Sequence, residues 1–105
     1  MLSRPKKMLW PPRKAAAAMP VGAATAGVLL TWAVIHNVTP FLIPFAEMGG
    51  AELLTFGAMN VLEASLFGVM LASFTRSPRR AFFLGAAFEA MLMTTMLLMT
   101  ILVYI

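Results

Sequence analysis

The stretch AFFLGAAFEAMLMTTMLLMTILVYI, residues 81–105, contains a single charged residue, Glu89. A helix needs about 20 apolar residues to cross a hydrocarbon core of about 30 Å, so this stretch is long enough to span a membrane. Residues 21–39 and 51–74 have the same apolar character. The sequence therefore predicts an all-α integral membrane protein with three transmembrane helices, at about 21–39, 51–74 and 81–105.

The composition of the whole chain agrees with this prediction. Of its 105 residues, 61% are hydrophobic and 11% are charged, against roughly 25% charged residues in an average soluble domain. The polar surface is too small to cover a water-soluble globule of this size. The absence of cysteine excludes a disulfide scaffold and a thiol enzyme. We expect one membrane domain over residues 1–105.

The formal net charge of +4 comes from cations that gather in two places. A nucleic-acid-binding domain spreads its cations over a folded face, whereas these flank apolar segments, as the residues that orient membrane proteins do. We therefore expect these cations to lie at the membrane surface, and we expect no nucleic-acid partner. The basic residues are Arg4, Lys6, Lys7, Arg13, Lys14, Arg76, Arg79 and Arg80.

These clusters also predict the topology. Residues 1–20 form a basic juxtamembrane arm, and residues 75–80 form a basic loop between the second and third spans. Three spans place both segments on one side, and the excess of cations marks that side as cytoplasmic or matrix. The predicted location is the bacterial inner membrane or the mitochondrial inner membrane.

Prolines and glycines mark the ends of the first span. Pro20 is expected at its start, where a missing N–H costs little. Residues 40–50 contain two prolines and a Gly-Gly pair, which predict an interfacial elbow. The alternative is a first helix that continues through Pro40 with a kink.

Small residues indicate where the helices pack. Lipid tails provide no hydrophobic drive between helices, so close contact between small side chains takes its place. The predicted packing positions are Ala18, Gly22, Ala26 and Gly85. The ten methionines are interpreted as adaptable packing surface against lipid or a partner, in preference to a copper site.

Two carboxyl groups lie inside the predicted spans, at Glu63 and Glu89, and Asn60 precedes Glu63 by one helical turn. A charge at the bilayer centre costs a few kcal/mol or more, so such residues usually face protein. The spans contain no Lys or Arg that could neutralise them. The carboxyl groups are therefore protonated, or a partner, cofactor or ion compensates their charge.

Two interpretations of this candidate intramembrane polar site remain open. Glu63 and Glu89 could relay protons or cations, or they could form structural hydrogen bonds across helices or to another chain. His36 lies in the outer part of the first span, which we expect to be too far toward the surface for a shared metal site. Haem or metal ligation by His36 is the less favoured alternative to a simple polar residue. We expect no intrinsic cofactor, but we expect bound lipid.

The glutamates also carry a resemblance. Leu62-Glu63 and the segment AAFEA at 86–90 are similar to the small proton-channel subunit of respiratory complex I, which has glutamates in consecutive helices. The resemblance covers about a third of the chain, and it implies a place in an energy-transducing complex. The chain departs from that family in two ways. The basic loop at residues 75–80 should lie on the opposite side of the membrane in that family, and the spacing between Glu63 and Glu89 is shorter.

The sequence thus predicts a small non-catalytic subunit of a larger membrane complex, respiratory or otherwise energy-transducing, with a role in assembly. Its expected partners are other membrane subunits, in a hetero-oligomer, and lipids. The alternative function is a proton- or cation-conducting subunit that uses the paired glutamates. No phosphate loop and no nucleophile beside a base is evident, so we do not expect an enzyme.

Overall fold

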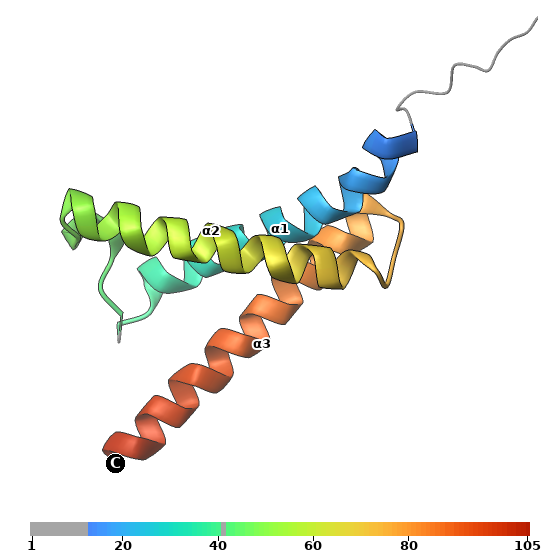
Figure 1. Cartoon of the computed structure of the whole chain (residues 1–105). Helices are drawn as coiled ribbons and strands as arrows, with labels where there is room; N and C mark the ends of the chain where they lie inside the picture. The colour runs from blue at the N-terminus through green and yellow to red at the C-terminus, as the bar shows by residue number, and fades with distance from the viewer. Residues whose placement is uncertain (1–12, 41) are drawn as a thin grey trace, which may run out of the picture.

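The computed structural model describes residues 13–40 and 42–105, and the secondary structure there is helical (Figure 1). Helix α1 spans Arg13–Val38, α2 spans Gly50–Ala72 and α3 spans Pro78–Tyr104. A short 3-10 turn, η1, occupies Phe45–Glu47. All three α-helices are long and apolar enough to cross a membrane. The prediction of an all-α, multi-pass membrane protein is confirmed.

Helix α1 begins earlier than expected, and Pro20 lies inside it. The expectation that Pro20 marks the start of the helix was therefore wrong. A proline in a helix interior removes one backbone hydrogen bond, but the apolar and helix-rich surroundings of a transmembrane segment tolerate it. Four consecutive alanines at residues 15–18, the strongest helix formers, extend the helix on the N-terminal side of the proline.

The other end of α1 is held by Asn37. Its Nδ2 donates to the Ala33 carbonyl at 2.7 Å, and its Oδ1 accepts from the Phe45 backbone N–H at 2.8 Å. The helix ends at Val38, so it does not continue through Pro40 as a kinked helix. Asn37 therefore fastens the predicted elbow, with its turn η1, to the end of α1.

Helix α3 begins before the predicted basic loop has ended. Ser77 caps the helix by accepting from the Arg80 N–H at 3.3 Å, and Pro78 takes the first helical position. Arg79 and Arg80 therefore lie in the first turn of α3, and the loop is shorter than 75–80. Their side chains and that of Arg76 are exposed.

Only part of the N-terminal cluster of cations lies among the residues that the structure describes. Arg13 and Lys14 belong to the first turn of α1. Arg4, Lys6 and Lys7 lie outside the described residues. The predicted membrane-surface role of this arm stays a prediction.

Helix α1 packs against both other helices, whereas α2 and α3 touch each other little. Glycines bring the backbones together. A Cβ on Gly27 would overlap the Phe82 carbonyl, one on Gly85 would overlap the Ala24 carbonyl, and one on Gly68 would overlap Thr25. We call this region the glycine crossing. The buried apolar residues around it are Ala24, Val28, Ala64, Leu71 and Ala81.

Of the four predicted packing positions, Gly85 is the one that packs closely against another helix among the described residues. Ala18 and Ala26 are exposed, and a Cβ on Gly22 would meet nothing among the described residues within 4 Å. Small residues occur on several faces of α1, so four-residue spacing alone does not identify the contact face. The face that packs is the one opposite Gly68 and Gly85, and it carries Pro20, Ala24, Gly27 and Val28.

Beyond the glycine crossing, α3 leaves the other helices (Figure 1). After Met93, which is buried, its residues are exposed, apart from half-buried Leu97 and Ile101. The three helices are therefore close together at one end and open at the other. We call residues 94–104 the distal part of α3.

Candidate functional site

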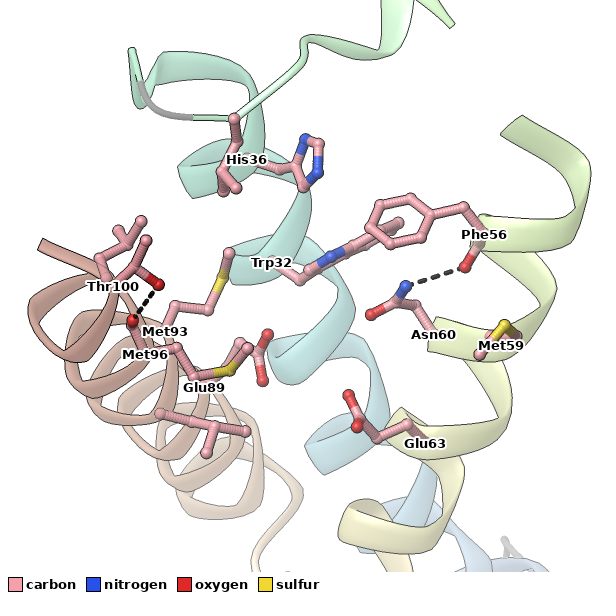
Figure 2. Close-up of a pocket in the computed structure, with 13 residues that line it drawn as sticks. Trp32, His36, Phe56, Met59, Asn60, Glu63, Glu89, Met93, Met96 and Thr100 are labelled. Carbon is pink, nitrogen blue, oxygen red and sulfur yellow. Dashed lines mark hydrogen bonds between the residues drawn. The ribbon is translucent and has the colours of Figure 1, made fainter. Parts of the chain in front are cut away.

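A cavity of about 350 Å³ lies where α2 and α3 diverge. Residues of α2 and α3 form its two walls, and the C-terminal half of α1 lies between them (Figure 2). It is lined by Trp32, His36, Leu42, Phe56, Met59, Asn60, Glu63, Glu89, Leu92, Met93, Met96, Leu97 and Thr100.

The cavity brings the two intramembrane glutamates together. Glu63 extends from α2 and Glu89 from α3, and both carboxyl groups point into the space between the helices (Figure 2). Measured along their helices from Ala72 and Pro78, their depths differ by about 3 Å, at 1.5 Å per residue. The two groups thus face one another at nearly the same membrane depth.

Their surroundings differ. Glu89 is 3% exposed, and its Oε1 has no hydrogen-bond partner among the described residues. Glu63 is exposed, near the middle of α2. A buried carboxyl oxygen without a partner is costly, so Glu89 requires a hydrogen-bond or charge partner that the described residues do not supply.

Asn60 lines the same cavity but does not bond to Glu63. Its Nδ2 donates to the Phe56 carbonyl at 2.8 Å (Figure 2). The carbonyl one turn back on the same helix satisfies the amide donor locally. Although Asn60 lies one helical turn before Glu63, no hydrogen bond between the two side chains is found among the described residues.

Several hydroxyl groups in the helices are satisfied in the same local way. Each donates at 2.8 Å to the carbonyl four residues earlier, as is common where no water is present. This applies to Thr25, Ser65, Thr95 and Thr100. The unpartnered Oε1 of Glu89 is therefore an exception among the buried polar side-chain atoms of the described residues.

His36 is the second exception, and the sequence did not place it here. It is 4% exposed, its Nδ1 has no partner among the described residues, and it lines the cavity with both glutamates. A cavity shared by His36 and the two glutamates was not predicted. The described residues nevertheless contain no group of three His, Cys, Asp or Glu arranged to hold a metal ion.

Aromatic rings line the end of the cavity nearest the elbow. The Trp32 ring centroid lies 5.0 Å from that of Phe45 and 5.5 Å from that of Phe56. His36 lies 5.1 Å from each of the same two rings. Aromatic pairs at these distances are stabilising, so this cluster joins α1, η1 and α2 into one unit. The four-residue spacing of Trp32 and His36 was the signal in the sequence, because it places both on one helix face.

No protein-family model, curated protein or solved structure matches the chain. Function is therefore inferred from the cavity and from the exposed helix faces.

The cavity combines three titratable groups with apolar and aromatic walls. Carboxyl groups and an imidazole can exchange protons, bind a cation or form hydrogen bonds to a partner. The basic residues Arg76, Arg79 and Arg80 belong to the opposite, tightly packed end of the helices. They therefore do not neutralise the glutamates.

Proposed function

We propose that the chain is a small, non-catalytic, multi-pass subunit of a larger membrane complex. The observation that supports this most is the divergence of α3, which leaves both the distal part of α3 and the Glu63 side chain exposed. The partners would be other membrane subunits in a hetero-oligomer, with lipid around them.

The position of Glu63 is the first argument. A carboxyl group exposed near the centre of a membrane helix costs a few kcal/mol or more when it meets lipid. A protein partner packed over the opening between α2 and α3 removes Glu63 from lipid. In the described helices, Lys and Arg occur only in the first turns of α1 and α3, far from the depth of Glu63, so a second copy would bring further carboxyl groups and no cation from the middle of its helices. A different subunit is favoured for this reason.

The distal part of α3 is the second argument. Leu98 is 56% exposed, Met99 61% and Leu102 73%, and Met96 is also exposed. Methionine side chains are flexible and polarisable, which suits contact with a partner of irregular shape. Bundled membrane helices usually pack along most of their length, so this half-helix is suited to packing against another subunit.

An energy-transducing role, in a bacterial or mitochondrial inner membrane, is part of the proposal. Ionisable groups at mid-membrane depth commonly mark proton or ion pathways, and the limited resemblance to a proton-channel subunit of respiratory complex I agrees. Proton or cation conduction by the chain itself is the second candidate function. It is favoured by one observation, the presence of Glu63, Glu89 and His36 in one cavity.

Purification of the tagged full-length chain from native membranes in mild detergent tests the first function. We expect other membrane subunits to co-purify at a fixed stoichiometry. Leu102→Trp, in the distal part of α3, should lower that yield several-fold, because it changes the proposed contact surface. Leu30→Trp, on the exposed face of α1, is the matched control and should leave the yield unchanged. Recovery of the chain as a lone species would contradict the proposal.

Proton flux in proteoliposomes tests the second function. If the chain conducts, Glu89→Gln and Glu63→Gln should each reduce flux at least tenfold, while Glu52→Gln at the start of α2 should not. Equal proton flux through the unmodified chain and the three variants would rule out a relay through the cavity.

The predicted orientation can be measured because the chain has no cysteine. Ser73→Cys and Ala46→Cys each place a single thiol at an exposed position, at opposite ends of α2. An impermeant thiol reagent added from the cytoplasmic or matrix side should label Ser73→Cys only. Labelling of Ala46→Cys from that side would reverse the topology.

A further inference from the structure

We propose that the cavity between α2 and α3 is a binding site for a lipophilic organic cation, with its charge held between Glu89 and Glu63. The ligand class is a quaternary or protonated amine that carries an apolar body. This inference uses only the described residues of this chain, so it does not depend on the proposed partner subunits.

Charge is the first step of the argument. Glu89 is almost completely buried, its Oε1 lacks a partner among the described residues, and the carboxyl group points into the cavity (Figure 2). Glu63 faces it from the other wall. The nearest basic residue along α3 is Arg80, about 13 Å away along the helix axis. The site therefore has two acidic groups, and none of the Lys or Arg side chains that the structure describes lies beside them, which is the charge pattern that attracts a cationic ligand.

The walls show what kind of cation fits. A volume of about 350 Å³ falls within the range of small-molecule pockets, about 300–1,000 Å³. Trp32 and Phe56 line the cavity, and aromatic faces attract ammonium groups through cation–π interactions. Met59, Met93 and Met96 add a flexible apolar surface for the rest of the ligand.

A metal ion fits the same walls poorly. Metal sites in proteins use three or more ligands at fixed geometry, and the described residues contain no such group of His, Cys, Asp or Glu. Apolar and aromatic side chains make up most of the lining instead. In the isolated chain the cavity is also open where α2 and α3 diverge, so a ligand dissolved in a nanodisc membrane can enter between the helices when no partner covers the opening.

His36 adds a distinction between two kinds of amine. Its buried Nδ1 has no partner among the described residues and can accept a hydrogen bond when the proton is on Nε2. A protonated tertiary amine carries an N–H that can donate to this atom, whereas a quaternary ammonium does not. His36→Phe should therefore weaken binding of the protonated amine more than binding of the quaternary one.

The test uses the full-length chain, purified in nanodiscs, and two probes of equal shape. Benzyltrimethylammonium is the cationic probe, and neopentylbenzene is its uncharged carbon isostere. Titration calorimetry measures the affinity. The fluorescence of Trp32, in a Trp10→Phe background, reports whether the probe enters the cavity. We expect saturable binding of the cation near one per chain, and binding of the isostere at least tenfold weaker.

Variants then locate the charge. Glu89→Gln keeps the shape of the side chain and should weaken cation binding at least tenfold. Glu63→Gln should weaken it less, because Glu63 is exposed. Glu52→Gln lies outside the cavity and should leave the affinity unchanged. Should Glu89→Gln fail to fold, the comparison of cation and isostere on the unmodified chain still decides the question. Equal affinity for the two probes, or no saturable binding of the cation, overturns the proposal.

Discussion

The glycine crossing and the cavity lie on the same three helices, yet they are built in opposite ways. At the glycine crossing, Gly27, Gly68 and Gly85 let backbones come into contact, and little space is left between helices. At the cavity, large side chains such as Trp32 and Met93 line an opening between α2 and α3. The comparison shows that side-chain volume, and not hydrophobicity, decides where these helices touch.

The two regions also differ in how their polar groups are satisfied. Near the crossing, the Thr25 hydroxyl donates to the Val21 carbonyl of its own helix. In the cavity, Glu89 Oε1 and His36 Nδ1 lack partners among the described residues. Unsatisfied groups and incomplete packing thus coincide, as is common at functional sites.

The largest expected effect comes from filling the glycine crossing. Gly85→Leu places a side chain against the Ala24 backbone, and Gly27→Leu places one against the Phe82 carbonyl. Neither obstacle is a flexible side chain, so the helices must move apart. Each substitution should destabilise the fold by about 3 kcal/mol, the upper part of the usual range for overpacking. Thermal unfolding in detergent measures the loss.

Gly22→Leu is the matched control for these two variants. A Cβ at Gly22 meets nothing among the described residues within 4 Å, and the position lies on the same helix as Gly27. Its effect should stay within about 0.5 kcal/mol, as for ordinary surface substitutions. Similar losses at Gly22 and Gly27 would mean that the crossing is not the tightest contact of the chain.

The second expected effect is a pH dependence of cation binding, which tests whether the cavity is an acidic site. Three titratable groups line it, Glu63 on α2, Glu89 on α3 and His36 on α1. A proton on either carboxyl group removes negative charge, and a proton on the imidazole adds positive charge. Each of these events opposes a bound cation.

Affinity for benzyltrimethylammonium should therefore fall as the pH is lowered. Where one proton competes with one cation, linkage predicts a fall of about tenfold per pH unit. Calorimetric titrations at pH values between 5 and 8 measure the slope. An affinity that rises on acidification would show that the carboxyl groups do not hold the cation.

The smallest effect concerns the elbow beside the cavity. Asn37→Ala removes the acceptor for the Phe45 N–H and the bond to the Ala33 carbonyl. The loss should be about 1 kcal/mol, the low end for two hydrogen bonds, because both bonds of Asn37 are exposed. Hydrogen exchange at the Phe45 amide should speed up by several-fold. Ser65→Ala, whose hydroxyl bonds only within α2, should leave that amide unaffected.

The helices themselves could be predicted because each depends on a local property, an apolar run long enough to cross a bilayer. Their ends were harder. The Ser77-Pro78 pair is a helix-start signal that a division into apolar and charged segments overlooks. The alanines before Pro20 carry α1 past the residue that was expected to begin it.

The part of the site that could be predicted from the sequence is the part that depends only on how far each residue lies along its helix from the connecting loop. Glu63 and Glu89 are at similar distances from one loop, so consecutive antiparallel helices bring them level. The inclusion of His36 depends on how α1 lies relative to α3, which no local pattern encodes. The same limit explains the packing stripe, because α1 has small residues on several faces and its partners determine which face is covered.

The glycine crossing has a mechanical consequence for α3. From Gly85 to Tyr104 the helix extends for about 28 Å, so it acts as a lever arm with its fulcrum at the crossing. A rotation of about 5° at the fulcrum moves Tyr104 by about 2.5 Å, and it moves the wall that carries Glu89 and Met93 by much less. A contact that shifts the C-terminal end of α3 therefore changes the width of the cavity by only a small fraction of that shift.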